Sequence, residues 1–196
     1  LAFAYALAYP EHVKSIVVSG VFTGSKAESD WVEQGGYRMF YPDVWERYLS
    51  AVPQNRHDNP GEYYYEQVTG KDALAAAQAG HGYQTMEGSL LSLDDRYIPD
   101  SLEDFDSNGV KLEMHYLRNL CFMPDRHIFD NAKKLTMPIY LVQGRYDMVC
   151  PPAAAYELNS LLPKSRLIWT TSGHRNEHEA WNIMRTLLLE QTAPLA

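Results

Sequence analysis

Two short segments rich in β-branched and aromatic residues constrain the fold of this chain most strongly. They are MPIYLVQG, at Met137–Gly144, and SRLIWTTSG, at Ser165–Gly173, and each ends at a glycine, as buried strands often do. The segment between them, Pro151–Leu162, predicts a helix that carries proline in its first turn, where a missing N–H is harmless. Strands that alternate with helices form parallel sheets, because the chain must cross back over the sheet between two parallel strands.

The beginning and the end of the chain extend this pattern. Leu1–Tyr9 predicts a buried helix ended by Pro10, and Val13–Gly20 predicts a further strand. His178–Gln191 predicts an amphipathic helix after the last strand, with an apolar face of Trp181, Met184, Leu187 and Leu188. The expected fold class is therefore α/β: the C-terminal strands of an open, mostly parallel sheet with flanking helices.

The middle of the chain follows a different pattern. From Phe22 to about Leu135 no segment convincingly predicts a strand, whereas four segments predict helices, namely Asp43–Ala51, Gly61–Thr69, Ala73–Gln84 and Val110–Phe122. Polar, turn-rich segments connect these helices. We expect residues 1–21 and 134–196 to form the core of the fold, and residues 22–133 to form an inserted helical cap.

Composition excludes several classes of protein. Hydrophobic residues make up 45% of the 196 residues, enough for a sizeable core, and no apolar run reaches the roughly 18 residues of a membrane span. The formal net charge of -8 argues against nucleic-acid binding, which needs a basic surface. Cys121 and Cys150 have no disulfide-framework or metal-binding spacing, and no signal peptide is recognisable. We therefore expect a cytoplasmic protein without membrane or nucleic-acid partners.

Two polar residues stand where open α/β sheets carry their functional groups, at the carboxyl ends of strands. Asp147 follows the first of the two C-terminal strands by one turn, and His174 follows the second directly. An aspartate and then a histidine, at the ends of successive strands, is the chain order of the last two members of an α/β-hydrolase triad. In that chemistry the imidazole is a general base and the carboxylate orients it. Either residue alone would more often be a turn or capping residue, so the prediction depends on the pair.

A nucleophile for such a triad is not recognisable in the chain. The G-x-S-x-G sequence of a nucleophile elbow occurs nowhere in the 196 residues. Ser19 lies at a predicted strand end but lacks the flanking glycines, and Cys150 follows Asp147 by three residues without a separate base. Neither residue is a convincing nucleophile.

Four segments together resemble the proline iminopeptidases, which are serine peptidases of the α/β-hydrolase fold. These segments are LAFAYALAYPEHV, SGVFTGSKAESDW, GRYDMVCPP and SGH, and the resemblance extends from Leu1 to about Leu189. In that family the nucleophile elbow directly precedes the first segment, so the resemblance puts the serine about five residues before Leu1. It implies that the chain is the C-terminal part of a longer enzyme. Without that N-terminal segment as its partner, the chain alone is expected to be inactive.

The resemblance also implies residues that bind the substrate, a peptide with a free N-terminal proline. Glu87 and Glu113 match cap glutamates that bind the free amino end of the substrate. Phe22, Val149 and Cys150 match residues that line the slot for the proline ring. The resemblance implies no cofactor and no metal.

Three departures from the family pattern leave the strictness of proline specificity open. Val32, Leu117 and Met86 stand where family members often have aromatic residues. A slot with smaller or softer walls would admit N-terminal residues other than proline.

Three alternatives stay open at this point. A capped α/β hydrolase of another specificity, an esterase or an epoxide hydrolase, would share the aspartate and the histidine without needing paired cap glutamates. The sequence HRNEH also matches the H-x-x-E-H motif of some zinc peptidases, which would involve His174, Glu177 and His178; that motif requires a helix, whereas His174 directly follows a predicted strand. The third alternative is a fragment without catalytic function.

Overall fold

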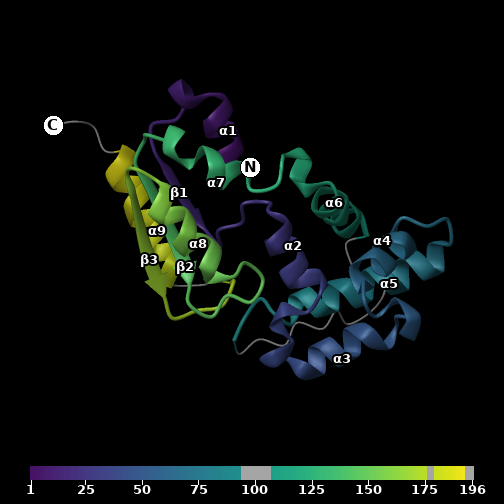
Figure 1. Ribbon diagram of the computed structural model, residues 1–196. Helices are drawn as coiled ribbons and strands as arrows, with labels where there is room; N and C mark the ends of the chain where they lie inside the picture. The colour runs from purple at the N-terminus through teal and green to yellow at the C-terminus, as the bar shows by residue number, and fades with distance from the viewer. Residues whose placement is uncertain (94–106, 176–178, 193–196) are drawn as a thin grey trace. The chain divides into compact units, whose positions relative to one another are not determined.

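The computed structural model describes residues 1–93, 107–175 and 179–192 (Figure 1). The chain divides into two compact units. Unit 1 consists of Leu1–Ser25 and Arg126–Ala196, and unit 2 consists of Lys26–Asp125.

The sheet of unit 1 has three described strands, all parallel and in the spatial order β1-β2-β3: β1 (Ile16–Ser19), β2 (Ile139–Gly144) and β3 (Ser165–Thr170). The register pairs Ser19 with Val142, and Gly144 with Thr170. The carboxyl ends of all three strands therefore meet at one edge of the sheet (Figure 1). This arrangement confirms the α/β fold class with a parallel sheet.

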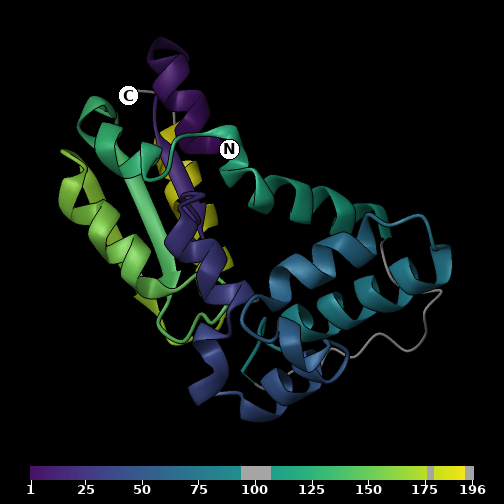
Figure 2. The ribbon, with the colours of Figure 1, turned by 45° about the vertical axis from the view of Figure 1, so that its right-hand side comes forward.

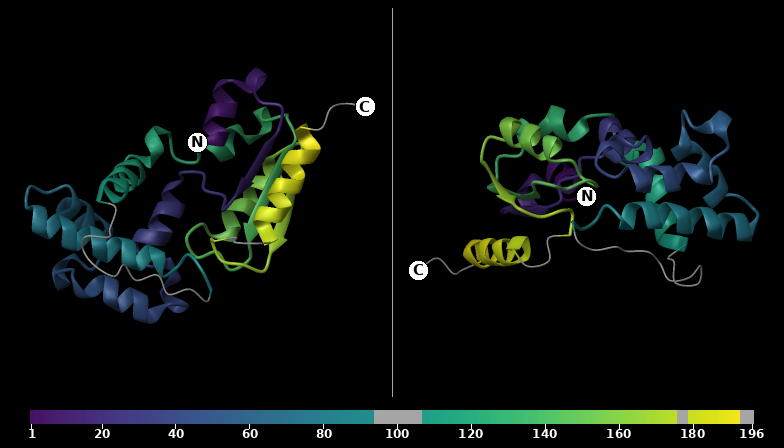
Figure 3. Two further views of the ribbon diagram at one scale, coloured as in Figure 1. Left: turned by 180° about the vertical axis from the view of Figure 1, so that it is seen from behind. Right: turned by 90° about the horizontal axis from the view of Figure 1, so that it is seen from below.

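Two helices cover the two faces of this sheet (Figure 2), α8 (Pro152–Leu161) and α9 (Glu179–Thr192). On the α9 face, Val142 forms an apolar cluster with Ala180 and Leu187. Side chains alternate across a strand, so Leu141 points to the opposite face, where α8 packs on β2 and β3. Figure 3 shows α9 lying along the sheet in the view from behind.

The buried face of α9 agrees with the predicted one at Met184 and Leu187 but not at Trp181 and Leu188. Ala180 and Leu187 are buried, whereas Trp181 is 62% exposed and Leu188 is 46% exposed. Leu187 lies with Ala180 in the cluster around Val142, and Ile183 and Met184 pack against that cluster partly buried.

The remaining helices of unit 1 come from both ends of its sequence. Helix α1 (Ala2–Ala8), followed by the 3-10 turn η1 (Pro10–His12), packs on α7 (His127–Asn131) and buries Phe3 and Ala6. The 3-10 turn η5 (Ala132–Lys134) follows α7 and contacts α8. Along the chain, unit 1 gives way to unit 2 after Ser25 and resumes after Asp125, and the predicted boundaries lie after Val21 and Lys133. Burial of Ile128, Phe129 and Ala132 holds this segment in unit 1.

Unit 2 is helical throughout its described part (Figure 1). Its elements are α2 (Lys26–Glu33), η2 (Gly36–Met39), α3 (Pro42–Ser50), η3 (Gln54–Arg56), α4 (Pro60–Val68), α5 (Ala73–Gly88), α6 (Ser107–Arg118) and η4 (Leu120–Phe122). The N–H of Lys26 donates to Asp125 Oδ1 at 2.9 Å, which joins the two ends of the unit. None of the described helices, in either unit, has the length and apolar character of a membrane span.

A chain of aromatic rings runs through the core of unit 2. The ring centroids of Tyr37 and Trp45 lie 6.0 Å apart, and those of Trp45 and Tyr48 lie 5.6 Å apart. Tyr48 stacks on Tyr64 at 4.3 Å, and Tyr64 lies 6.4 Å from Tyr83. Rings from η2, α3, α4 and α5 therefore pack together in the core of unit 2, alongside buried aliphatic side chains such as Val44 and Leu90.

Candidate functional site

Asp147 and His174 lie together beyond the carboxyl edge of the sheet in unit 1. The distances from His174 Nδ1 to the two carboxylate oxygens of Asp147 are 3.2 and 3.1 Å. Asp147 is fully buried, whereas the side chain of His174 is 29% exposed. With Nδ1–H donated to the carboxylate, Nε2 is the ring nitrogen that is free to take a proton. The residue types and the geometry are those of a general base held by an orienting carboxylate.

The turn after β2 holds the carboxylate of Asp147 in this position. The backbone N–H groups of Val149 and Cys150 donate to Asp147 Oδ1 at 3.0 and 2.7 Å. The backbone of Arg145 and Tyr146 is bonded in turn to the end of β3, through the carbonyl oxygens of Thr170 and Ser172. Charge-assisted hydrogen bonds of this kind stabilise an ionised carboxylate that is out of contact with water.

Gln143 is a residue of this site that sequence reasoning missed. It is fully buried near the end of β2, and its Nε2 donates to Asp147 Oδ2 at 3.1 Å and to the Cys150 carbonyl at 3.0 Å. Its Oε1 accepts from the N–H of Val21 at 2.9 Å. The amide of Gln143 thus joins the segment after β1 to the turn that carries Asp147. A glutamine within the apolar run YLVQG is the signal that could have revealed it, because a buried amide needs hydrogen-bond partners.

Two glycines allow the close approach of backbone and imidazole at this edge. A Cβ at Gly20, which has φ +58°, would lie 3.0 Å from His174 Cε1. A Cβ at Gly144 would lie 2.3 Å from the carbonyl oxygen of Gly173, so no other residue fits there without movement of the backbone. The two strand-ending glycines therefore leave the space in which His174 reaches Asp147.

The other predicted residues of unit 1 lie on the segments that follow β1 and β2. Cys150 is buried and Val149 is partly buried, and both are tied to Asp147 by their N–H groups. Phe22 is partly buried and directly follows Val21, which is bonded to Gln143. Ser19 lies in β1, paired with Val142. Contact of Phe22, Val149 and Cys150 with a substrate stays a prediction.

Glu87 and Glu113 lie together in unit 2, on α5 and α6. Their carboxyl groups share a hydrogen bond, and Tyr83 donates its hydroxyl to Glu113 Oε1 at 3.3 Å. Burial, together with the neighbouring Glu87, raises the pKa of Glu113 to about 8, and burial also raises the pKa of Glu87. Two carboxyls that share a hydrogen bond share a proton, because two adjacent carboxylates repel each other. The pair can release that proton when a cation binds.

The zinc alternative concerns His174, Glu177 and His178. Glu177 and His178 lie outside the described residues, and His174 lies in the loop between β3 and α9 rather than on a helix. Within residues 1–93, 107–175 and 179–192, no three His, Cys, Asp or Glu side chains converge on a point that could hold a metal ion.

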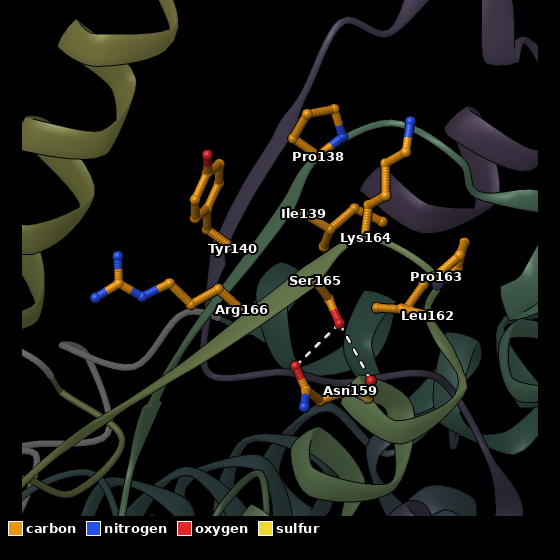
Figure 4. Close-up of a pocket in the computed structure, with 9 residues that line it drawn as sticks. All are labelled: Pro138, Ile139, Tyr140, Asn159, Leu162, Pro163, Lys164, Ser165 and Arg166. Atoms are coloured by element: carbon orange, nitrogen blue, oxygen red, sulfur yellow. Dashed lines mark hydrogen bonds between the residues drawn. The ribbon is translucent and has the colours of Figure 1, made fainter.

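A separate hollow of about 310 Å³ lies at the opposite edge of the sheet, where β2 and β3 begin (Figure 4). Ser165 lines it and donates its hydroxyl to the backbone carbonyl of Asn159 at 3.1 Å and to Asn159 Oδ1 at 2.9 Å. The basic side chains of Lys164 and Arg166 also line this hollow. It lies at the amino ends of the strands, away from Asp147 and His174.

The sequence and the structure of this chain were compared with known proteins, and both comparisons identify the same fold. Residues 1–175 match the family model described as the alpha/beta hydrolase fold. An α/β-hydrolase enzyme from a Medee basin deep-sea metagenome library superposes with a TM-score of 0.61 and 16% identity, covering 100% of this chain and 62% of that one. An esterase from Exiguobacterium antarcticum superposes with a TM-score of 0.57 and 16% identity, over 98% of this chain and 62% of that one. At such low identity these two structures support the fold alone.

Curated relatives by sequence are named as proline iminopeptidases. A probable proline iminopeptidase of Leptolyngbya boryana is 31% identical over 86% of this chain and 54% of its own length. Those of Arabidopsis thaliana and Xylella fastidiosa (strain Temecula1) are 32% and 33% identical, over 89% and 93% of this chain and 48% and 60% of their own lengths. The chain thus spans about half to three-fifths of the lengths of these relatives.

These matches confirm the resemblance to proline iminopeptidases that the sequence segments indicated. The parallel sheet, the position of the Asp147–His174 pair at its carboxyl edge and the family match over residues 1–175 agree with one another. The chain belongs to the alpha/beta hydrolase fold family.

Proposed function

We propose that this chain is part of a serine aminopeptidase that releases N-terminal proline from peptides. The observation that carries the proposal is the hydrogen-bonded pair of Asp147 and His174 at the carboxyl edge of the sheet. The similarity to proteins named proline iminopeptidases supports the substrate. The 196 residues contain no G-x-S-x-G elbow, so the proposal requires a serine from outside this sequence.

In the proposed reaction, His174 is the general base and then the general acid. Its Nε2 takes the proton of the serine hydroxyl while the serine oxygen attacks the carbonyl carbon of the N-terminal proline. Collapse of the tetrahedral intermediate breaks the peptide bond, and the imidazolium gives its proton to the departing amine. A water molecule then releases proline from the acyl-enzyme by the same two proton transfers. Asp147 stays ionised and stabilises the imidazolium throughout.

The carboxyl pair of unit 2 would bind the free amino end of the substrate. The prolyl nitrogen carries a positive charge, and the pair Glu87–Glu113 can supply a negative charge by releasing its shared proton. A buried cation is costly unless such a partner accepts its N–H donors. This role explains why a free amino end would be required, and it would make unit 2 the substrate-binding cap of the enzyme.

The chain alone is expected to be inactive, since loss of the triad serine costs on the order of a million-fold in turnover. Assay of the purified 196-residue chain with prolyl p-nitroanilide tests this point. Release of proline by this chain, titrated to zero by a serine-directed inhibitor, would contradict the requirement for an outside serine.

The substrate is tested on protein expressed together with the coding sequence upstream of Leu1. We expect a G-x-S-x-G sequence there, hydrolysis of prolyl p-nitroanilide, and loss of kcat on the order of ten-thousand-fold in Asp147→Asn. Glu87→Gln and Glu113→Gln should lower kcat/KM for free amino ends. Equal turnover of N-acetylprolyl and prolyl anilides would rule out an aminopeptidase, and preferential turnover of simple esters would favour the esterase alternative.

A further inference from the structure

The two carboxylate oxygens of Asp147 are held by groups of different kinds. Oδ1 accepts from the backbone N–H groups of Val149 and Cys150, at 3.0 and 2.7 Å, within the turn that carries the aspartate itself. Oδ2 accepts from the side-chain amide of Gln143 on β2, at 3.1 Å. The same two oxygens lie 3.2 and 3.1 Å from His174 Nδ1. Donors on both oxygens therefore fix the plane in which the carboxylate meets the imidazole.

The amide of Gln143 can face Asp147 in only one orientation. Its Oε1 accepts from the N–H of Val21 at 2.9 Å, and its Nε2 donates to the Cys150 carbonyl at 3.0 Å as well as to Asp147. Reversal of the amide would place Oε1 against two acceptors and Nε2 against a donor. The side chain is fully buried, so bulk water does not compete for these bonds. Because an amide does not titrate near neutral pH, the donor to Oδ2 is present whatever the state of the imidazole.

The loop that carries His174 is joined to the same end of β2. The N–H of Tyr146 donates to the carbonyl oxygen of Ser172 at 3.1 Å, which ties the turn after β2 to the segment just before the histidine. The backbone positions of Gln143 and His174 are thus linked through the sheet edge. The Asp147 carboxyl can still rotate about its Cβ–Cγ bond, so its orientation depends on the donors that it meets.

We propose that Gln143 is a positioning residue for the proton on His174 Nδ1. By donating to Oδ2, its amide keeps the buried Asp147 carboxyl ionised and in the plane in which it accepts the Nδ1 proton. Nε2 is then the ring nitrogen that takes a proton from a nucleophile. This inference deepens the proposed function and rests on it for the reaction, whereas the state of the imidazole can be measured on this chain alone.

A simpler role for Gln143 is to join the segment after β1 to the turn after β2, through Val21 and Cys150. Both roles predict a loss of stability when the amide is removed. They differ at the imidazole. A residue that only joins two backbone segments would affect the Nδ1 proton of His174 no more than any other substitution that loosens this part of the core to the same extent.

NMR spectra of the unmodified 196-residue chain provide the first test. The shifts of the two ring nitrogens of His174 show which of them carries the proton, and a proton held by a carboxylate exchanges slowly with water. At a pH above the titration of the imidazole, we expect the proton on Nδ1. The side-chain N–H groups of Gln143 should exchange at least about a hundredfold more slowly than those of Gln54, which is exposed. A proton on Nε2, or equal exchange of the two glutamines, would overturn the inference without any variant.

Two substitutions then remove the donor. Gln143→Met keeps nearly the length of the side chain, and the His174 Nδ1 proton should exchange at least about tenfold faster in this variant, since a hydrogen bond to a charged acceptor is worth at least that factor. Gln143→Asn keeps an amide that is one methylene too short to reach Asp147 Oδ2 and Val21 together, so the same acceleration is expected.

Thr170→Val is the matched control. It removes a buried hydroxyl that donates to the backbone carbonyl of Gln143 at 3.4 Å, and it leaves every donor to Asp147 in place. Its Nδ1 proton should exchange within about twofold of the unmodified rate. Unchanged exchange in a folded Met or Asn variant would reject the positioning role, and equal acceleration in Thr170→Val would show that general loosening is the cause.

Kinetics separate this inference from the proposed function. In protein expressed with the coding sequence upstream of Leu1, Gln143→Met should lower kcat for prolyl p-nitroanilide at least about tenfold and change KM less than about threefold, because the amide acts on the general base and not on the substrate. A change confined to KM would contradict the positioning role. If the protein does not hydrolyse prolyl anilides while the exchange results hold, the proposed substrate falls and the role of Gln143 stands.

Discussion

At the scale of single residues, the geometry of the Asp147–His174 pair depends on groups that have no chemical role of their own. Gln143 supplies a donor to the carboxylate, a donor to the Cys150 carbonyl and an acceptor for Val21. Gly20 supplies space beside the imidazole. Both act by holding other groups in place, and both can be tested on the chain without a substrate.

Gln143→Leu should destabilise the chain by roughly 2–4 kcal/mol, because it leaves one buried donor and two buried acceptors without this partner. Urea unfolding followed by circular dichroism measures the change. The matched control is Gln54→Leu at an exposed position, which should change stability by less than about 0.5 kcal/mol. Equal effects of the two substitutions would show that the amide network contributes little to stability.

Gly20→Ala should displace the ring of His174 and destabilise the chain by about 1–2 kcal/mol, since the residue has φ +58° and the new Cβ would meet His174 Cε1 at 3.0 Å. The NMR signals of the His174 imidazole report the displacement. Gly109→Ala, within α6, is the control and should be neutral or stabilising, because alanine favours helix by about 1 kcal/mol. Unchanged imidazole signals in Gly20→Ala would contradict the steric argument.

At the scale of elements, the segment after α6 shows a backbone strain that no sequence pattern indicates. Leu120, Cys121 and Phe122 have φ values of 48°, 52° and 58°, so three successive residues other than glycine are left-handed. The predicted helix Val110–Phe122 instead ends at Arg118. The turn then closes through the N–H groups of Phe122 and Met123, which donate to the carbonyl oxygens of Asn119 and Leu120. Ring contacts of Phe122 with His115 and Tyr116 of α6 favour this turn.

Cys121→Gly should therefore be more stable than Cys121→Ala, by roughly 0.5–1 kcal/mol, because glycine adopts left-handed angles without a Cβ clash but gains freedom in the unfolded chain. Both variants lack the thiol, so their difference measures the backbone alone. Thermal and urea unfolding of the two proteins provide the comparison. If the alanine variant is as stable as the glycine variant, the left-handed turn is not strained.

At the scale of the whole molecule, negative charge opposes stability as pH rises. The chain carries a formal net charge of -8, and unit 2 concentrates carboxyls whose pKa is raised, to about 7 for Glu33 and about 8 for Glu113. A carboxyl with a raised pKa binds its proton more tightly in the folded state. Its contribution to stability is therefore complete at low pH and is lost as pH rises through the folded-state pKa.

The melting temperature should consequently fall between pH 5.5 and pH 8.5, because the Glu33 and Glu113 carboxyls ionise in a partly buried cluster over this range. Glu33→Gln should show a smaller fall and a higher melting temperature than the unmodified chain at pH 8.5. Glu46→Gln, exposed on α3, controls for the change in net charge and should decline in parallel with the unmodified chain. Parallel curves for all three proteins would mean that Glu33 does not titrate in this range.

Much of the fold could be predicted because its pattern is local. The segments that form β1, β2 and β3 are rich in β-branched residues and each is followed or ended by a glycine, so they could be predicted as strands from local sequence alone. The helices α3, α4, α5 and α8 also have local sequence signals. A proline lies in the first turn of α3, α4 and α8, and Asp72 is the N-cap of α5. The helix α2 was missed, because KAESDWVE contains few apolar residues and is helical through its burial of Val32 in unit 2.

The sequence by itself determined the parallel sheet, the order of Asp147 and His174 at its edge, and the resemblance to a family, because each depends on residues that are near in the chain or on strand ends that must meet. Only the tertiary structure decided which side chains hold Asp147 and His174 in place, and which charged side chains lie near one another in unit 2. Gln143 reaches Val21 across 122 positions, and the charge of Glu113 acts on Glu33 only after helices pack. Contacts between distant residues depend on the packing of whole elements, which no local pattern encodes.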